Sequence, residues 1–423
     1  MKFYKNKDVF KKRGLNLLLI LLFYRIGQLI PLPFIEPEFL KPLSEDSTYL
    51  NRISEMTGGQ FENLSLLSLG LSPWMTTMII WYVFTMNRRS ELKRYPSRIL
   101  DRYKYSLAFF LSIIQAWALI LRLDAQAWIT VNGLSITFVK VFVIIILTAG
   151  AFLMIWLANL NSRYGIGGLA SLILVNILMR LITTFKEMAN ILLEQNNLAL
   201  LLTIIVLSIS LIPFWIIMDR IEIQYRLKRP MINNEFAQNV FVPIKLNTAG
   251  AMPIMFAYSF FMLPQNILKI LSRIFPKNNE FASIGENLTL NHPFGIFIYL
   301  ICLLLLIIAF AFIQFNPDDL SDKLLKNGDY IINLRPGKTT NHFLMRQLIK
   351  YSLIGGVFLI IITVAPLIVA LRLEELNSFS MLPGTMFIVA SLSLTIIEEM
   401  QLYRVIHHYN PLFPLETNIN KKG

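Results

Sequence analysis

Long apolar runs separated by short polar and basic segments dominate the chain of 423 residues. A membrane-spanning α-helix needs about 20 mostly apolar residues. Runs that approach this length lie at 15–33, 73–86, 106–121, 138–158, 169–185, 198–218, 249–268, 294–315, 351–371 and 380–397. The composition agrees, because 55% of the residues are hydrophobic and 15% are charged. We therefore predict an all-α, multi-span membrane protein with ten transmembrane helices.

The second apolar run is interrupted where a membrane helix should be continuous. Gly70 and Pro73 separate a short apolar segment from the run that ends at Met86. A single helix cannot pass through Pro73 undisturbed, because proline lacks a backbone donor and clashes with the preceding turn. Broken backbone at membrane depth is tolerated only inside protein or beside an aqueous cavity. We expect two half-length helices facing an internal pathway; an ordinary kinked helix is the alternative.

Lysine and arginine are distributed unequally between the two sides of this arrangement. With the N-terminus in the cytoplasm, the cytoplasmic segments carry 28 of these residues and the opposite side carries eight. Basic loops resist translocation, so this excess favours cytoplasmic tails at 1–14 and 399–423. No small-residue cleavage site follows the first apolar run, which we expect to be a retained span rather than a signal peptide.

The ten spans divide into an N-terminal half, 15–197, and a C-terminal half, 198–398. An odd number of spans per half places the second half upside down relative to the first, as in inverted-repeat membrane proteins. The pattern G-x-x-P-x-M occurs in the second span of each half, at 70–75 and 250–255. This short internal repeat supports an arrangement of two inverted five-helix halves.

Two cytoplasmic segments, 219–248 and 316–350, are too long and basic to be simple connections. They could bind anionic lipid headgroups. Alternatively, they could dock an acidic or nucleic-acid-containing partner. Neither segment has interleaved aromatic residues or a nucleic-acid-binding motif, so we expect no sequence-specific nucleic-acid recognition.

Residues for enzymatic or metal chemistry are scarce. Cys302 is the single cysteine, and the four histidines lie in polar connections without metal-ligand spacing. The triplet that begins at Gly337 resembles the end of a phosphate-binding loop, but Ile332 stands where that motif requires glycine. We therefore expect no cofactor, no metal site and no enzymatic activity.

Arg25 is the charged residue placed deepest in a predicted span, about midway along the first. An intramembrane charge needs buried partners. Carbonyl groups of the broken second span or the carboxylate of Glu62 are candidates. Our hypothesis is that Arg25 holds the broken segment against the first span.

Short motifs follow one another along nearly the whole chain. They are YRIG at 24–27, IPLP at 30–33, GGQFENLS at 58–65, LGLSP at 69–73, FLSIIQ at 110–115, GIGG at 165–168, RIEIQY at 220–225, PIKLNTAGAMP at 243–253, FNPDD at 315–319 and LRPGKT at 334–339. Together they resemble the SecY/Sec61 family of protein-conducting channels. The resemblance implies two inverted five-helix halves around a central hourglass pore through which unfolded secretory polypeptides pass.

Some positions depart from the common family pattern. Phe34 stands where glycine is usual, the sequence Gly-Leu-Ala at 168–170 replaces Asn-Gly-Ile, and methionine often replaces isoleucine. These departures resemble the accessory, second SecY of some Gram-positive bacteria, which exports serine-rich glycosylated adhesins. The housekeeping SecY channel is the alternative within the family.

The resemblance implies a ring of apolar side chains at the waist of the pore. Its members here would be Leu71, Met75, Ala170, Leu174, Met252, Met255, Ile388 and Val389. An apolar constriction dewets and blocks ions, and flexible methionine side chains can adapt to a passing polypeptide. Ordinary filling of gaps between helices is the alternative role for these methionines.

The resemblance also implies a plug at 61–70 and a lateral gate between spans two and three on one side and seven and eight on the other. The apolar plug residues would be Phe61, Leu64, Leu66, Leu67 and Leu69. Polar gate candidates are Thr76, Thr77 and Gln115.

The partners implied by the resemblance are a SecA-type ATPase motor, in particular the accessory SecA, or a ribosome, and a SecE-like small subunit. SecG-like or accessory Sec proteins, the secretory preprotein and anionic lipids complete the set. The motor would dock on Arg226, Lys228, Arg229, Arg335 and Lys338. The expected location is the bacterial plasma membrane. A secondary transporter with inverted repeats is the main alternative of another class, although no ionisable cluster marks the middle of the spans.

Overall fold

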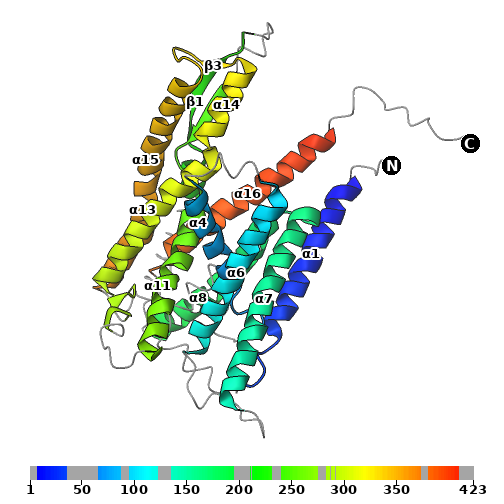
Figure 1. Ribbon diagram of the computed structural model, residues 1–423, viewed down its shortest axis with the longest axis vertical. Helices are drawn as coiled ribbons and strands as arrows, with labels where there is room; N and C mark the ends of the chain where they lie inside the picture. Colours follow the sequence, from blue (N-terminus) through cyan, green and yellow to red (C-terminus); the bar gives the residue numbers. More distant parts are fainter. Residues whose placement is uncertain are drawn as a thin grey trace, which may run out of the picture.

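The structure is a computed structural model, and it describes residues 7–35, 65–86, 95–121, 135–194, 210, 212–230, 240–274, 283–285, 287–290, 292–372 and 380–408. Helices dominate it (Figure 1). They are α1 (Lys7–Leu29), α4 (Ser72–Met86), α6 (Ser97–Ile120), α7 (Ile136–Tyr164), α8 (Gly168–Glu194), α11 (Met252–Ile274), α13 (Pro293–Phe315), α14 (Pro317–Asn327), α15 (Lys338–Ala370) and α16 (Leu382–His408). The strands are β1 (Glu222–Lys228), β2 (Phe241–Lys245) and β3 (Tyr330–Ile331).

Most of the predicted spans correspond to one of these helices. The run at 198–218 is the exception, because it lies largely outside the described residues, of which 212–220 are helical. Six helices in the described part of the chain are long and apolar enough to cross a membrane. The structure therefore confirms a multi-helix membrane fold, and the count of ten spans stays a prediction.

The repeated G-x-x-P-x-M pattern adopts the same local geometry in both halves. Gly70 and Gly250 have left-handed φ angles of 54° and 61°, and a helix begins two residues after each of them. Pro73 and Pro253 are the second residues of α4 and α11. A proline in the first helical turn loses no hydrogen bond, which explains why both helices begin at this point.

The helices form two groups that meet along a central seam. α1, α6 and α7 lie on one side, and α11, α13 and α15 lie on the other (Figure 1). Contacts of α11 with α4 and α6, and of α16 with α8, join the two groups. The largest apolar cluster among the described residues includes side chains from both halves.

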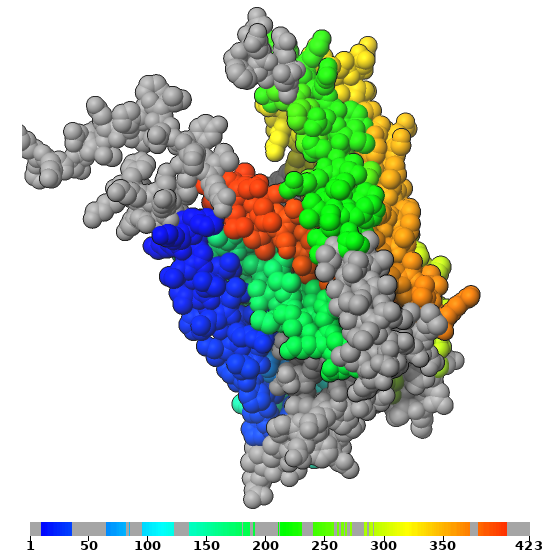
Figure 2. Space-filling model, turned by 180° about the vertical axis from the view of Figure 1, so that it is seen from behind, coloured from blue at the N-terminus to red at the C-terminus, as the bar shows by residue number. Residues whose placement is uncertain are grey.

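A small antiparallel sheet connects the two basic loops at one end of the helical fold. Its strand order is β2-β1-β3, with Leu227 opposite Ile331 in the β1–β3 pair. Pro243 is tolerated because β2 is an edge strand. The sheet packs on α14 and the first turns of α15 through a separate apolar cluster that includes Leu324 and Leu344. The described parts of the two loops thus form one folded unit, called the sheet unit below, which extends beyond the ends of α1 and α16 (Figure 2).

The described ends of the chain lie toward the same end of the molecule as this sheet. The first turns of α1 and the last turns of α16 point to the end that carries α14 and the strands (Figure 1). This arrangement is the one expected if the tails and the two basic loops share one side of a membrane.

Candidate functional site

The eight residues predicted for the pore ring all belong to, or pack against, the large apolar cluster that includes side chains from both halves. Four of the eight are fully buried in the cluster: Leu71, Met75, Met255 and Ile388. The other four pack against the cluster and remain partly exposed: Ala170, Leu174, Met252 and Val389. The start of α4, together with α8, α11 and α16, thus contributes apolar side chains to this cluster.

The cluster also contains residues that the sequence analysis missed. Ile79 lies one turn beyond Met75 on α4 and is 2% exposed. Ile173 and Ile177 are equally buried on α8. Leu71, Met75 and Ile79 are spaced by four residues, which places them on one helix face. This spacing could have identified Ile79 from the sequence.

The described part of the predicted plug forms successive turns instead of the expected half-length helix. The amide of Ser68 donates to the carbonyl of Ser65 at 3.1 Å, and the amide of Gly70 donates to that of Leu67 at 2.9 Å. Leu67 and Leu69 are buried and Leu66 is half-buried. Leu67 belongs to the same apolar cluster as the predicted ring. Phe61 and Leu64, also predicted for the plug, lie outside the described residues.

Two glycines on neighbouring helices make room for this turn. A Cβ at Gly27 of α1 would stand 2.6 Å from a methyl carbon of Leu67, and one at Gly150 of α7 would stand 1.9 Å from the carbonyl oxygen of Leu66. The turn is also tied to the end of α1, because the amide of Leu66 donates to the carbonyl of Ile30 at 3.0 Å. We call Gly27 and Gly150 the glycine seat.

The hydrogen bonds of the predicted gate residues lie within α4 and α6, on the N-terminal side of the seam. Gln115 Nε2 on α6 donates to Thr76 Oγ1 on α4 over a long 3.4 Å, and Thr77 Oγ1 donates to the carbonyl of Pro73 at 2.7 Å. All three side chains are buried. Both α4 and α6 belong to the N-terminal half, so opening the seam toward α11 would leave these hydrogen bonds intact.

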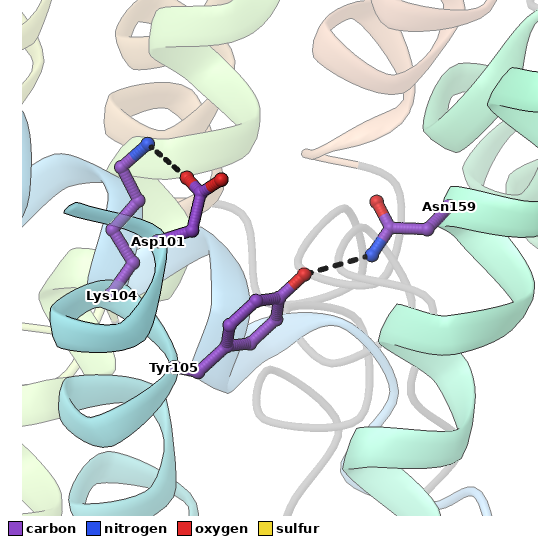
Figure 3. Close-up of polar contacts among 4 residues, drawn as sticks. All are labelled: Asp101, Lys104, Tyr105 and Asn159. Carbon is purple, nitrogen blue, oxygen red and sulfur yellow. Dashed lines mark hydrogen bonds and ion pairs between the residues drawn. The ribbon is translucent and has the colours of Figure 1, made fainter. Parts of the chain in front are cut away.

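Further polar and aromatic contacts lie along α6. Asn159 on α7 donates from Nδ2 to the Tyr105 hydroxyl on α6 at 3.2 Å, and Lys104 pairs with Asp101 at 3.2 Å (Figure 3). The Tyr105 ring stacks on Trp74 of α4 with 5.3 Å between ring centroids. Tyr105 thereby links α4, α6 and α7 into one unit.

Arg25 has a different partner from those that we expected. Its Nη1 donates to Gln28 Oε1 at 2.9 Å, one turn along the same helix. Gln28 Nε2 in turn donates to Asn176 Oδ1 on α8 at 3.2 Å. Arg25 thus belongs to a polar network between α1 and α8, and Glu62 lies outside the described residues.

Four of the five predicted docking residues are exposed on the sheet unit. They are Arg226, Lys228, Arg335 and Lys338. Arg229 differs, because its Nε lies 3.3 Å from Oδ2 of the buried Asp329. The Arg335 carbonyl accepts hydrogen bonds from the hydroxyls of Thr339 and Thr340, which fixes the start of α15 and leaves the guanidinium exposed.

Comparisons with known sequences point to one family. A family model described as SecY matches residues 65–397. The accessory Sec system protein translocase subunit SecY2 of Streptococcus salivarius is 31% identical over 405 residues, which cover 96% of this chain and 98% of that protein. The protein of the same description from Leuconostoc gelidum is 29% identical over 399 residues, covering 93% and 95%.

Solved structures share the fold at low sequence identity. One described as the structure of a protein-conducting channel aligns with a TM-score of 0.66 and 16% identity over 94% of each chain. Sec61 in the canine ribosome-channel complex aligns with a TM-score of 0.61 and 16% identity, again over 94% of each chain.

Proposed function

The chain belongs to the SecY family of protein-conducting channels, and we propose that within this family it is the channel subunit of an accessory Sec translocase. It is a protein-translocation channel rather than an enzyme. Similarity to SecY2 proteins over nearly the full length supports the accessory role. Its substrates would then be serine-rich glycosylated adhesins carried across a bacterial plasma membrane.

One observation carries the proposed resting state: the predicted ring side chains from both halves and Leu67 of the predicted plug share a single apolar cluster. An apolar constriction formed by these side chains would exclude water and ions. Its methionines can also adapt to different passing side chains, because they are unbranched and flexible.

Opening would require the plug turn to leave this cluster and the seam between α4 and α11 to separate. Exposing Leu67 and Leu69 would cost roughly 5 kcal/mol. A signal segment that binds better to the open form can supply this free energy. The chain would then release hydrophobic segments sideways into lipid through the same seam.

The energy for transport would come from a partner. We propose that a SecA-type ATPase docks on the exposed cations of the sheet unit, and that a SecE-like subunit, with SecG-like or accessory Sec proteins, completes the translocase. The sheet unit and both tails would face the cytoplasm. The excess of basic residues in these segments supports that orientation.

Reconstitution tests the proposal. Proteoliposomes that contain the chain, its small subunits and the accessory motor should protect an adhesin precursor from external protease when ATP is supplied. Protection of a general secretory precursor but not of the adhesin would refute the accessory role. Co-purification from native membranes would identify the motor and cargo independently.

A further inference from the structure

The two occurrences of G-x-x-P-x-M belong to longer turns that repeat one pattern of hydrogen bonds. In the plug turn (65–70), the amide of Leu66 donates to the carbonyl of Ile30, the residue directly after α1, at 3.0 Å. Leu246 has the same position relative to the second motif. Its amide donates to the carbonyl of Ile221, the residue directly after the helix that precedes β1, at 2.8 Å. Each turn is therefore joined to the end of the first span of its half.

Side chains repeat the same geometry. Ser68 Oγ donates to the carbonyl of Ser65 at 2.7 Å, and Thr248 Oγ1 donates to that of Lys245 at 2.6 Å. Each hydroxyl thus closes its turn three residues back along the chain. We call residues 245–251 the second turn. It is the counterpart of the plug turn in the C-terminal half.

Each turn also lies against a glycine of α7 or α15, which are the fourth predicted spans of their halves. Gly150 of α7 leaves space for the carbonyl oxygen of Leu66. Gly355 of α15 does the same for the carbonyl oxygen of Leu246, which a Cβ at this position would overlap. The obstacle is backbone in both cases, so neither turn could keep its place beside an alanine.

The two turns differ in the side chain at their centre. Leu67 enters the apolar cluster of the predicted ring. Its counterpart is the buried Asn247, which donates from Nδ2 to Asp219 Oδ1 at 3.2 Å. α13 also contacts the second turn, because Gln314 Nε2 donates to the carbonyl of Ala249 at 3.1 Å. Breaking such contacts leaves polar groups unsatisfied. The second turn is therefore held in place by polar contacts where the plug turn presents an apolar side chain.

We propose that the second turn is a fixed counterpart of the plug turn: an anchor, held against Gly355, that positions the start of α11 and with it Met252 and Met255. α11 begins directly after this turn. The amide of Met255 donates to the carbonyl of Ala251, the last residue of the turn, at 3.3 Å. The plug turn can then move during opening while the start of α11 keeps its place. The ring role of the two methionines rests on the proposed function, whereas the anchoring of the turn does not.

Thiol labelling of the purified full-length chain in micelles tests the anchor. In a Cys302→Ser background, Thr248→Cys reports on the second turn and Met255→Cys reports on the first turn of α11. Both native side chains are buried, so a maleimide should label these cysteines slowly. Gly355→Ala should make both reactions roughly tenfold faster, because the turn must leave its place and open locally.

Gly356→Ala is the matched control, because a Cβ there would first meet the side chain of Ile307 and not backbone. It should leave both rates unchanged. Gln314→Leu is a milder variant at an exposed position, and it decides the outcome if Gly355→Ala does not fold. It removes the hydrogen bond to the turn and should also speed labelling of Thr248→Cys. Thr363→Cys, at a buried threonine two helical turns further along α15, should stay unlabelled in every variant.

Unchanged labelling in Gly355→Ala and Gln314→Leu would overturn the proposal, as would equal acceleration by Gly355→Ala and Gly356→Ala. Labelling of Thr363→Cys in Gly355→Ala would overturn it too, because the glycine would then support the whole bundle and not this turn. The measurement needs no motor and no substrate, so its failure is distinct from a failure of polypeptide transport.

Discussion

Gly150 of α7 lies against the carbonyl oxygen of Leu66 so closely that a Cβ at this position would stand 1.9 Å from that oxygen. The obstacle is backbone rather than a flexible side chain, so the turn at 65–70 cannot keep its place beside a larger residue. The closed arrangement of the plug turn therefore depends on the absence of a side chain at position 150.

The first prediction is that Gly150→Ala displaces the plug turn and makes resting membranes leak. Alanine should strengthen α7 itself by about 1 kcal/mol, so a loss of closure would arise from the contact and not from the helix. Ionic current through planar bilayers measures the leak. Gly14→Ala is the control, because nothing lies within 4 Å of a Cβ there. Equal, low currents in both variants would show that the glycine seat does not hold the seal.

The second prediction concerns the apolar ring. Met75→Asp combined with Met255→Asp places two carboxylates among fully buried side chains, and these charges should hydrate the constriction. We expect a resting ionic current well above that of the wild type. Replacing both methionines by leucine should leave the bilayer tight, because the ring stays apolar. A tight bilayer with the aspartate variant, correctly inserted, would reject the ring assignment.

Local rules explain what the sequence could predict. The break before α4 follows from Gly70 and Pro73, since each acts within one turn of the chain. The approach of Leu67 to Gly27 could not be predicted, because a close contact between a turn and a helix leaves no periodic signal in the sequence. The strands were missed for a related reason: β1 pairs with β3 about a hundred residues away, and Pro243 weakens the strand signal of β2.

The residues of the predicted ring show the same limit of sequence-based prediction. They were assigned from family resemblance, and their membership of one cluster depends on how the helices of both halves pack together. Helical spacing alone would have extended the set to Ile79, but it could not have related Met75 to Met255.

The third prediction is that Arg335→Glu abolishes motor-driven export while the protein remains inserted in the membrane. The guanidinium is exposed, and the structural hydrogen bonds at this position involve the backbone carbonyl. Charge reversal should therefore affect docking and not folding. Arg372→Glu, an exposed arginine at the other end of α15, is the control and should export normally. Export at the wild-type level by Arg335→Glu would remove this residue from the docking surface.

The fourth prediction concerns Asp219, which lies at the start of the first basic loop. Burial is the main cause that raises the pKa of its carboxyl group, although Lys245 and a hydrogen bond from Asn247 act in the opposite direction. The folded state therefore binds this proton more tightly than the unfolded state does. Stability must then fall as the pH rises from the ordinary carboxyl range through the raised pKa.

Asp219→Asn removes this penalty and keeps the Oδ1 acceptor for Asn247, which donates to it at 3.2 Å. The variant should have a higher Tm than the wild type at pH 7, and the difference should vanish below about pH 4, where aspartate is protonated in both states. Thermal unfolding in detergent across this range measures the effect. Asp322→Asn, an exposed site on α14, should give no such trend. A Tm gap for Asp219→Asn that is independent of pH would mean that packing, not the buried charge, governs stability at this position.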